Sequence, residues 1–251
     1  MTDISVITAV YNRAATIGRA MDSLAEQTHP AEHVVIDGAS TDGTLDIVRD
    51  RAGAGDTVIS EPDNGIYDAL NKGIAAAKGD VIGLLHSDDL FASPTVLARI
   101  AEMFDADADL DAVYADAAFF RPEAPDRIIR RYRSARFSPA RIGWGLMPAH
   151  TTLYLRRRVF DHHGLYRTDY RIAADYEFIA RIFKDGTLKA RYEPDVWVKM
   201  QTGGISTGGL RSTIQINREV LRACRSNGIK INWFKLLSKY PAKIAEFLRP
   251  T

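Results

Sequence analysis

The sequence predicts an α/β protein built on a mainly parallel sheet with helices on both faces. Within residues 1–90, short apolar runs typical of buried strands alternate four times with segments whose apolar residues recur at helical spacing. At 251 residues and 46% hydrophobic content, the chain is long enough to bury a full core. Polar residues also follow three of the predicted strands, where ligands bind in parallel sheets.

The first half supplies the repeating units of this sheet. An apolar run with β-branched residues predicts each strand, and apolar residues three or four positions apart predict each helix. In chain order we expect strand Ile4–Val10, a helix at 17–24, strand 33–36, a helix from 45, strand Thr57–Ser60, a helix at 66–77 and strand 81–85.

The second half is less regular. Periodicity predicts helices at 96–104 and 175–183, short strands at 112–115 and 127–132, and a half-buried strand at 150–155. A loop at 143–148 precedes that last strand. The glycine-rich stretch 203–209 indicates a loop or boundary, and two helices are expected beyond it, at 210–226 and 232–248.

Charge and cysteine content limit the environment and the partners. The formal net charge is +1, so global charge indicates no partner, and no nucleic-acid partner is expected. Residues 210–251 hold nine Lys and Arg but two Glu, so a basic tail follows a net acidic body. One cysteine excludes an internal disulfide. No leader and no membrane-spanning apolar run is visible, so a cytoplasmic location is expected.

Asp88 and Asp89 follow the fourth predicted strand directly. Two adjacent carboxylates at a buried strand end repel each other, and a divalent cation with phosphate on its far side would relieve this. A helix cap before Ser93 is the alternative, and the pair alone does not decide between them. Tyr11, Asn12 and Asp37 fall at the same predicted edge, which favours a ligand site.

Two common nucleotide-binding motifs are absent. No Gly-x-Gly-x-x-Gly follows the first strand, and no Gly-x-x-x-x-Gly-Lys-Ser/Thr occurs in the sequence. This argues against a dinucleotide-dependent dehydrogenase and a P-loop NTPase.

Six ordered blocks resemble family-2 glycosyltransferases of the GT-A fold, which transfer sugars from nucleotide donors with inversion. The resemblance covers about residues 3–205 and leaves the basic tail outside. The blocks are 5–12, 23–28, 35–44, 63–73, 77–80 and 86–89. It implies a catalytic domain over 1–205, with a nucleotide-binding half at 1–90 and an acceptor-binding half at 91–205, and a basic amphipathic helical extension at 206–251.

The resemblance also implies donor-binding residues. Asp37 matches the acid that hydrogen-bonds the nucleobase, usually uracil, and Gly38 stands where the family commonly has a second Asp. The remaining donor contacts are expected from Thr8 and Tyr11 at the base and ribose, Asn12 in the same loop, and Asn71 and Lys72 at the phosphates.

For the metal, the resemblance implies Mn²⁺ or Mg²⁺ held by Asp89, with Asp88 as ribose partner or second ligand. The two acids can exchange these roles. His86 replaces the usual first acid. A neutral metal ligand is one interpretation, and we favour a hydrogen-bond donor at a position that tolerates the change.

Asp175 is the expected general base, because the family places an acid at the start of a late helix, within reach of the acceptor hydroxyl. Inverting displacement needs one base on the face opposite the leaving diphosphate. From sequence alone, a helix cap is an equal alternative for Asp175. Glu177 is a rival carboxylate, two residues further along the helix.

Acceptor contacts are assigned to His150 and Trp144, with structural roles as the alternatives. Arginines from 121 to 136 suit an anionic acceptor or a solvated face. The aromatic and basic residues of 230–249 suit an anionic membrane surface, with packing on the domain or in a homodimer as the alternative.

The expected function is therefore inverting transfer of a hexosyl or N-acetylhexosaminyl group from a nucleotide sugar, most simply a UDP-sugar, to a glycan or polyprenyl-diphosphate-linked acceptor. One competitor is a sugar-phosphate nucleotidyltransferase, but residues 8–13 lack its glycine-rich loop. The other is a non-catalytic nucleotide-sugar-binding protein, which the presence of Asp88, Asp89 and Asp175 disfavours.

Overall fold

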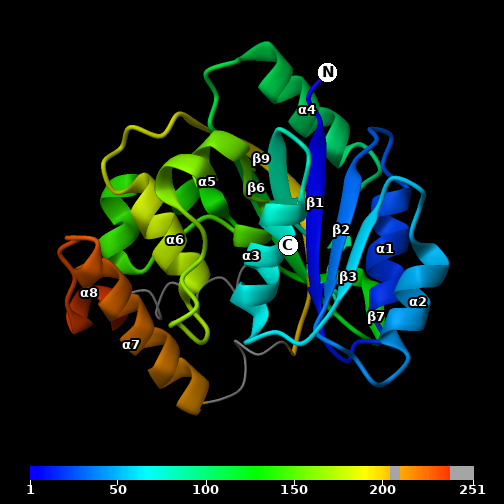
Figure 1. Ribbon diagram of the computed structural model, residues 1–251. Helices are drawn as coiled ribbons and strands as arrows, with labels where there is room; N and C mark the ends of the chain where they lie inside the picture. The colour runs from blue at the N-terminus through cyan, green and yellow to red at the C-terminus, as the bar shows by residue number, and fades with distance from the viewer. Residues whose placement is uncertain (204–209, 238–251) are drawn as a thin grey trace.

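The computed structural model describes residues 1–203 and 210–237 and confirms the predicted α/β class. Within these residues, a nine-stranded sheet forms the centre of the molecule, and helices cover both of its faces (Figure 1). The strands run in the order β3-β2-β1-β4-β8-β6-β9-β5, and β7 pairs with β6 outside this path.

The first half follows the sequence prediction closely. Its strands pair in parallel in the order β3-β2-β1-β4, with Val10 opposite Asp37 and Ile7 opposite Leu84. Their carboxyl ends therefore share one edge. The elements are β1 (Ile4–Val10), α1 (Ile17–Ala25), β2 (Glu32–Asp37), α2 (Thr44–Arg51), β3 (Thr57–Ser60), α3 (Ile66–Ala76) and β4 (Val81–Leu84).

Beyond β4 the sheet becomes mixed. β8 (Tyr154–Arg156) pairs antiparallel with both β4 and β6 (Ala112–Arg121), so β6 runs parallel to the first four strands. The other strands are β5 (Leu90–Phe91), β7 (Ala124–Tyr132) and β9 (Ala190–Gln201). The helices are α4 (Val96–Ala106), α5 (Arg157–His163), α6 (Ala174–Phe183), α7 (Leu210–Ser226) and α8 (Trp233–Leu237). Three short 3₁₀ turns are η1 (Ser134–Arg136), η2 (Pro139–Trp144) and η3 (His150–Thr152).

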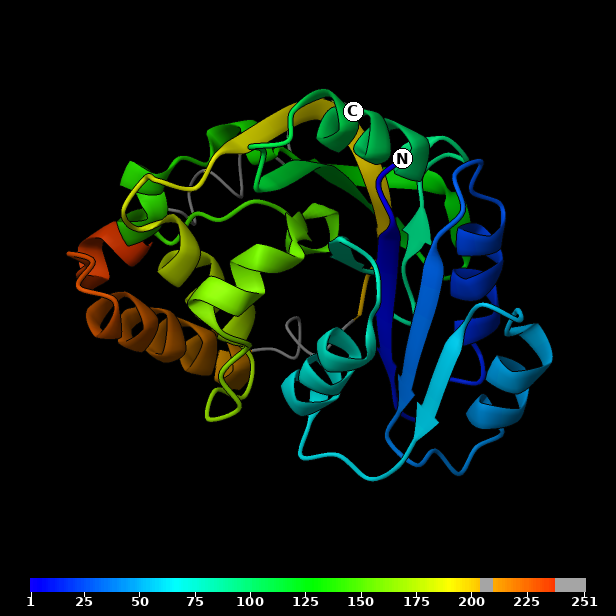
Figure 2. The same cartoon turned by 45° about the horizontal axis from the view of Figure 1, so that its top comes forward.

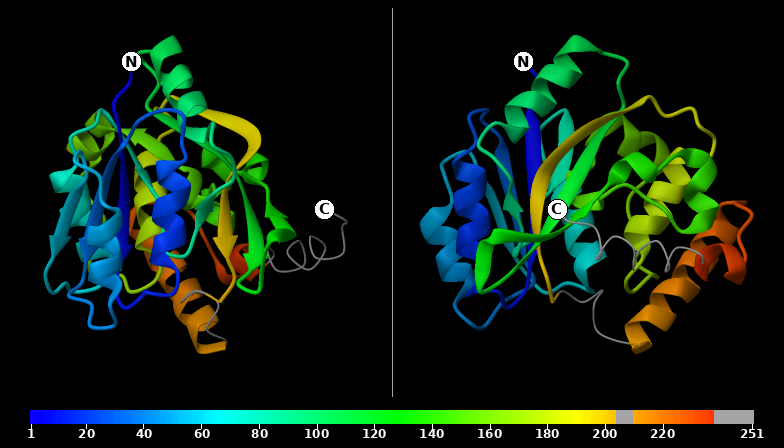
Figure 3. Two further views of the ribbon diagram at one scale, coloured as in Figure 1. Left: turned by 90° about the vertical axis from the view of Figure 1, so that its right-hand side faces the viewer. Right: turned by 180° about the vertical axis from the view of Figure 1, so that it is seen from behind.

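Several strands of this half differ from the prediction. β5 was not predicted, β6 is longer than the predicted 112–115, and two further errors have a visible cause. Residues 150–152 form η3 rather than the start of a strand, because Thr152 Oγ1 bonds to Ala115 O and Ala149 O inside the core. The second error is β9, which was not predicted although it runs along β6 (Figure 3). Its ladder passes from Glu193 directly to Val196, and this bulge at Pro194 breaks the alternation that identifies a strand.

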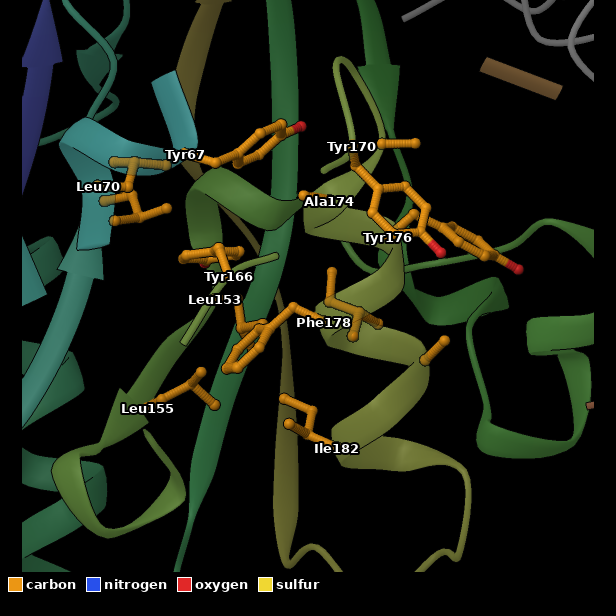
Figure 4. Close-up of a cluster of buried hydrophobic side chains, with 14 of the residues drawn as sticks. Tyr67, Leu70, Leu153, Leu155, Tyr166, Tyr170, Ala174, Tyr176, Phe178 and Ile182 are labelled. Carbon is orange, nitrogen blue, oxygen red and sulfur yellow. The ribbon is translucent and has the colours of Figure 1, made fainter. Parts of the chain in front are cut away.

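The hydrophobic core has two layers, one on each face of the sheet. On one face α1 and α2 pack over Val10 and Val35. On the other face α3 packs on Ile7 and Ile36, and α6 extends the same cluster (Figure 2). Aromatic residues dominate the space between α3 and α6, where Tyr166 lies against Phe178 with ring centroids 4.7 Å apart (Figure 4).

The C-terminal helices share this second core layer. Cys224 of α7 is buried, and its Sγ lies 3.4 Å from the hydroxyl of Tyr176 in α6. Leu236 of α8 is also fully buried in this layer. The predicted domain boundary at 205/206, most of the predicted loop 203–209 and the last part of the predicted helix 232–248 lie outside the described residues. No helix of the described residues is long and apolar enough to cross a membrane.

Candidate active site

Six of the eleven predicted site residues lie toward the carboxyl ends of β1 and β2 or in the loops that follow β1 and β4. Thr8, near the end of β1, is fully buried, and its hydroxyl donates to Leu85 O at 2.8 Å and contacts His33 Nε2 at 2.9 Å. Thr8 thus holds the segment before His86 against β1 and is not open to a ligand.

Asn12 and Asp37 hold the loops after β1 and β2 together. Asn12 has a left-handed backbone with φ of 51°, and its backbone N–H donates to Ser40 Oγ at 2.8 Å. Its side-chain Oδ1 accepts the Thr41 N–H at 2.9 Å. The Asp37 carboxylate is fully buried and accepts bonds from Ser40 N and Ser60 Oγ at 3.1 and 2.7 Å. Both residues therefore shape these two loops, and direct contact of the fully buried Asp37 with a base requires the loops to move.

Tyr11 is the open side chain of this region. It is 58% exposed, and its ring stands beside Gly38. A Cβ added to Gly38 would lie 3.4 Å from Tyr11 Cδ2 and 2.5 Å from Asp63 Oδ2. Asp63 Oδ1 is held by the Gly65 N–H at 2.8 Å. The Asp63 carboxylate thus occupies the space that a side chain at position 38 would take.

The two residues predicted at the donor phosphates bond within the protein instead. The Asn71 side chain donates to Tyr166 O at 2.8 Å and accepts the Tyr166 N–H at 3.0 Å. Lys72 Nζ lies 2.7 Å from Glu61 Oε1 and donates to Pro62 O. Both side chains thus have partners in the neighbouring loops, and their contact with the donor phosphates stays a prediction.

Asp88 and Asp89 form an acidic pair with unequal environments. Asp89 is only 3% exposed, whereas Asp88 is half-buried. Gln201 N, at the end of β9, donates to Asp89 Oδ1 at 3.1 Å. Burial, followed by repulsion from Asp88, raises the pKa of Asp89 well above its ordinary value despite that bond. The protein around Asp89 therefore does not compensate its negative charge.

A divalent cation fits this pair. Within the described residues, no group of three or more His, Cys, Asp or Glu side chains is arranged to hold a metal ion alone. Mg²⁺ and Mn²⁺ commonly take one or two carboxylates and complete their shell with phosphate and water oxygens. Asp88 and Asp89 match this partial ligand set.

His86 and His150 connect this loop with Asp175. His86 Nε2 lies 2.9 Å from His150 Nε2, and His150 Nδ1 lies 3.6 Å from Asp175 Oδ2. Burial lowers the pKa of His150 to about 4, and burial with the nearby His150 lowers the pKa of His86 to about 4. Both rings are neutral near pH 7.

Asp175 begins the first turn of α6, and its environment favours the protonated form. Its side chain is 22% exposed, and Oδ1 accepts the Tyr176 N–H at 2.7 Å. Burial raises the pKa of Asp175 to about 6, although the Tyr176 N–H, His86 and Tyr67 act in the opposite direction. Tyr67 of α3 points toward the start of α6 (Figure 4) and donates to Ile172 O.

Glu177, the rival carboxylate, is closed off. It is 2% exposed and lies 3.0 Å from the Arg181 guanidinium one helical turn away. Asn227, directly after α7, also donates to it at 3.2 Å. A carboxylate that is buried and paired on both sides cannot meet a substrate hydroxyl, so Asp175 is the open acid of α6.

Some supporting residues were not found from the sequence. Glu219 of α7 accepts the backbone N–H groups of Ile172 and Ala173 at 2.9 and 2.8 Å, directly before α6. Burial acts to raise the pKa of Glu219, but these bonds outweigh it and the pKa is lowered. Gln201 and Glu219 lie in segments without a motif, so no sequence signal identifies them. Tyr67 lies inside the block 63–73 that resembles the family, so that block is the sequence signal that could have identified it.

Trp144 is not brought to the other site residues. Lys235 Nζ lies 5.6 Å from the centroid of its ring, against α8. Trp144 also lines a surface pocket of about 380 Å³ with Lys184 and Asp185, which follow the C-terminal end of α6. Asp175 is at the opposite end of that helix, so the indole has a packing role in this structure.

Four arginines of the β6–β7 region fall into two groups. Arg131 pairs with the buried Asp116 at 2.8 Å, and Arg130 stacks over the Phe119 ring, so these two are structural. Arg121 and Arg127 instead line a surface pocket of about 760 Å³ with Thr202, which directly follows Gln201.

Comparison with known proteins identifies the family. The sequence profile of Glycosyl transferase family 2 matches residues 5–165. A PGL/p-HBAD biosynthesis glycosyltransferase of Mycobacterium bovis is 32% identical over 226 residues, which is 87% of this chain and 82% of that protein. Succinoglycan biosynthesis protein ExoU of Rhizobium meliloti is 34% identical over 206 residues, or 76% of this chain and 59% of ExoU.

Solved structures agree on the fold. S. aureus TarS 1-349 in complex with UDP-GlcNAc superposes with a TM-score of 0.69 at 20% identity, covering 88% of this chain and 66% of that one. The mannosyltransferase PcManGT of Pyrobaculum calidifontis, in complex with GDP-Man and Mn²⁺, gives a TM-score of 0.66 at 24% identity and the same two coverages. The chain thus spans just under two thirds of these two structures, and likeness at this identity shows the GT-A fold. With the family profile and the relatives above, the chain belongs to glycosyltransferase family 2 and is a glycosyltransferase.

Proposed function

We propose that this glycosyltransferase moves a sugar from a UDP-sugar to a hydroxyl group of a glycan or lipid-linked glycan, with inversion at the anomeric carbon. The observation that carries this proposal is the link from the acidic pair to Asp175. His86, two residues before Asp88, contacts His150, and His150 faces the Asp175 carboxylate. A cation site and a candidate base therefore lie within one connected group of side chains.

The comparisons support the chemical class of the substrates. Relatives are named for PGL/p-HBAD biosynthesis and for succinoglycan biosynthesis, which supports a glycan or glycolipid acceptor. Chains of similar structure were solved with UDP, UDP-GlcNAc and GDP-Man, which supports a nucleotide-sugar donor. For an anionic acceptor, Arg121 and Arg127 offer cationic groups beside the segment that contacts Asp89.

Asp175 acts as the general base. Its Oδ1 is held by the Tyr176 N–H, and Oδ2, which faces His150 Nδ1, keeps a lone pair that can take the proton of the acceptor hydroxyl as that oxygen attacks the anomeric carbon. A pKa near 6 leaves the carboxylate ionised at neutral pH and basic enough to accept that proton. The leaving diphosphate departs from the opposite face of the sugar, which gives inversion.

Asp88 and Asp89 hold the divalent cation, Mn²⁺ or Mg²⁺. When bound there, the cation stabilises negative charge on the departing diphosphate. Asp89 is buried, and its carboxylate accepts the Gln201 N–H, so Asp89 is the metal ligand whose orientation is fixed. The more exposed Asp88 serves as second ligand or ribose partner.

The nucleoside binds between the loops after β1 and β2. Tyr11 supplies the exposed aromatic surface on which a base stacks. Thr8, Asn12 and Asp37 hold the wall of this pocket through the hydrogen bonds described above, and Asp63 presents a carboxylate beside Gly38.

A donor panel tests the proposal. Purified protein is incubated with Mn²⁺ and UDP-, GDP- or dTDP-sugars, and release of the nucleoside diphosphate is followed. Release of UDP from a UDP-sugar, lost in Asp175→Asn while UDP binding is retained, is expected. Release of pyrophosphate from a sugar phosphate and nucleoside triphosphate would instead indicate a nucleotidyltransferase. Binding without turnover of any donor would indicate a non-catalytic protein.

A second part of the proposal concerns the location of the enzyme at an anionic membrane surface. Trp233 and Phe234 of α8 are 48% and 78% exposed, and Lys230 precedes them. Exposed aromatic rings next to basic side chains suit the interface of an anionic bilayer. Residues 238–249 of the predicted membrane segment lie outside the described residues.

Sedimentation with liposomes checks this part. The wild-type protein is expected to sediment with vesicles of anionic phospholipid and not with neutral ones, and the double variant Trp233→Ser/Phe234→Ser is expected to lose most of that binding. Equal sedimentation of the variant would reject α8 as the membrane contact.

A further inference from the structure

Two histidines bridge the loop after β4 and the first turn of α6. They come from different elements, His86 from the loop and His150 from η3, and Asp175 belongs to α6. The His86 and His150 rings are tilted by 53° with their Nε2 atoms 2.9 Å apart, so a nitrogen of each ring faces the other. His150 turns its second nitrogen, Nδ1, toward Asp175 Oδ2 at 3.6 Å.

The Asp175 carboxylate fixes the donor-to-acceptor direction of the hydrogen bonds between these side chains. An ionised carboxylate only accepts hydrogen bonds, so His150 carries its proton on Nδ1 when it faces Asp175. A neutral ring has one N–H, so His150 Nε2 is then the acceptor and His86 Nε2 is the donor. Each ring is therefore restricted to one tautomer. The His86 N–H points to His150, and the His150 N–H points to Asp175. The separation of 3.6 Å is longer than a direct hydrogen bond, and such contacts commonly shorten when substrate binds.

His150 stands on a rigid support. The two residues after it, Thr151 and Thr152, are fully buried. The Thr152 hydroxyl donates to Ala115 O and accepts the Ala115 N–H, which fastens η3 to the middle of β6. The backbone that carries His150 is therefore held in place. The position of the ring then sets the direction that Asp175 Oδ2 takes.

Other groups also surround the Asp175 carboxylate. Oδ1 accepts the Tyr176 N–H. The Tyr67 hydroxyl from α3 donates to Ile172 O and, as a hydrogen-bonding neighbour of Asp175, also acts to lower its pKa. Tyr166 from the segment before α6 faces the carboxylate as well. Both tyrosines keep their protons at neutral pH, because burial raises the pKa of each hydroxyl. Of the ionisable side chains near Asp175, His150 is the one that presents an N–H to Oδ2.

We propose that His86 and His150 are positioning residues, which act in series to orient the Asp175 carboxylate and to couple it to the loop that carries Asp88 and Asp89. The proposal rests on the function proposed for Asp175. When the donor binds and that loop moves, the two rings would move with it and shift the Asp175 carboxylate. The base is then oriented when the donor is in place.

Matched substitutions separate this role from a merely structural one. His86→Gln keeps a donor near the Nε2 position, and His86→Leu removes it. His150→Asn keeps a donor near the Nδ1 position, and His150→Leu removes it. The reaction followed is Mn²⁺-dependent UDP release from the UDP-sugar selected by the donor panel, with water in place of the acceptor, and UDP affinity is measured by calorimetry.

Both Leu variants are expected to lower kcat about 10-fold or more, a smaller loss than the roughly 10²–10⁴-fold attributable to the base itself, with UDP affinity unchanged. His86→Gln and His150→Asn are expected to recover most of kcat. The double variant His86→Leu/His150→Leu is expected to be no slower than His150→Leu, because residues that act in series are not additive. The Asn and Gln variants retain polarity at these positions, so they give a result even where a Leu variant fails to fold.

Several outcomes would overturn the proposal. Weaker UDP binding with unchanged kcat in His86→Leu would place His86 in the donor site instead. Additive losses in the double variant, or no recovery in His86→Gln, would show that the rings do not act in series. If Asp175→Asn abolishes turnover while both Leu variants keep wild-type kcat, the positioning role fails and the proposed function stands. Full turnover by Asp175→Asn would reject the proposed base.

Discussion

The carboxylate of Asp63 lies over Gly38, so close that a Cβ on Gly38 would be 2.5 Å from Asp63 Oδ2. The loop after β2 and the segment before α3 therefore meet at Gly38, which carries no side chain beside Asp37. Because real Cβ atoms do not approach an oxygen this closely, any residue other than glycine at position 38 must displace Asp63.

Gly38→Ala is therefore expected to weaken UDP binding and to destabilise the protein by about 1 kcal/mol, the low end for overpacking, because Asp63 is half-exposed and can turn away. Calorimetry with UDP and urea unfolding measure the two effects. The double variant Gly38→Ala/Asp63→Ala should recover stability. Gly55→Ala is the control, since nothing lies within 4 Å of a Cβ there. Equal effects at positions 38 and 55 would contradict the proposed steric conflict.

The pH dependence of turnover should follow Asp175. A base must be ionised to act, so kcat/KM is expected to rise with pH through about 6 and to level off above it, as the pKa of Asp175 predicts. Steady-state UDP release from pH 5 to 8 measures this limb. An acid limb centred near pH 4 would show that Asp175 is not raised, or that it is not the base.

The same pKa has a consequence for stability with the opposite sense. Burial raises the pKa of Asp175 from an ordinary 3.8 to about 6, so the folded state binds its proton more tightly than the unfolded state does. The stability from this proton is complete below about pH 3.8 and is lost as pH rises through 6. Asp175→Asn should therefore melt at a higher temperature than wild type at pH 8, with the difference shrinking by pH 5. A variant less stable than wild type at pH 8 would count against this.

Glu177→Gln should separate stability from catalysis. The substitution leaves the Arg181 charge without its buried partner, which typically costs about 3–5 kcal/mol. Urea unfolding is expected to show this loss, whereas folded Glu177→Gln should keep kcat within about threefold of wild type because Glu177 is closed off from substrate. A loss of kcat as large as in Asp175→Asn, with folding intact, would reassign the base to Glu177.

Metal and UDP should stabilise the wild type through Asp89. A ligand that binds only the folded state raises the melting temperature, so Mn²⁺ with UDP is expected to raise it for the wild type and much less for Asp89→Asn. Differential scanning fluorimetry with and without EDTA checks this. An equal rise in both proteins would remove Asp89 from the metal site.

Glu219→Ala should act on catalysis from the C-terminal helix. It leaves the backbone N–H groups of Ile172 and Ala173 without their acceptor, at a cost of about 1–3 kcal/mol. Because Asp175 is two residues beyond Ala173, kcat is expected to fall as well, and Glu219→Gln should lose less of both. Urea unfolding and UDP release measure the effects, with the exposed Glu102→Ala as control. Unchanged kcat in Glu219→Ala would mean that α7 supports the fold without influencing the base.

Local periodicity was sufficient for the elements of the first half, because each strand or helix there buries a face that recurs at its own spacing. The same reasoning missed β9, whose pairing with β6 tolerates a bulge at Pro194. It also extended a strand back to His150, because alternation at 150–155 does not reveal that Thr152 bonds across to Ala115.

The amino-acid sequence by itself determined the α/β class and the strand-end loops and identified the candidate acids, because these depend on local pattern and on blocks of adjacent residues. Only the tertiary structure decided which polar groups remain open. Asn71 and Lys72 bond to nearby loops, Glu177 is sealed by Arg181, and Asp175 is left facing His150. The Glu177–Arg181 pair is local, one helical turn apart, but Asn71 bonds to Tyr166, 95 residues away, and His86 and His150 are 64 residues apart. Such pairings follow from how the helices pack on the sheet, and no local spacing records them.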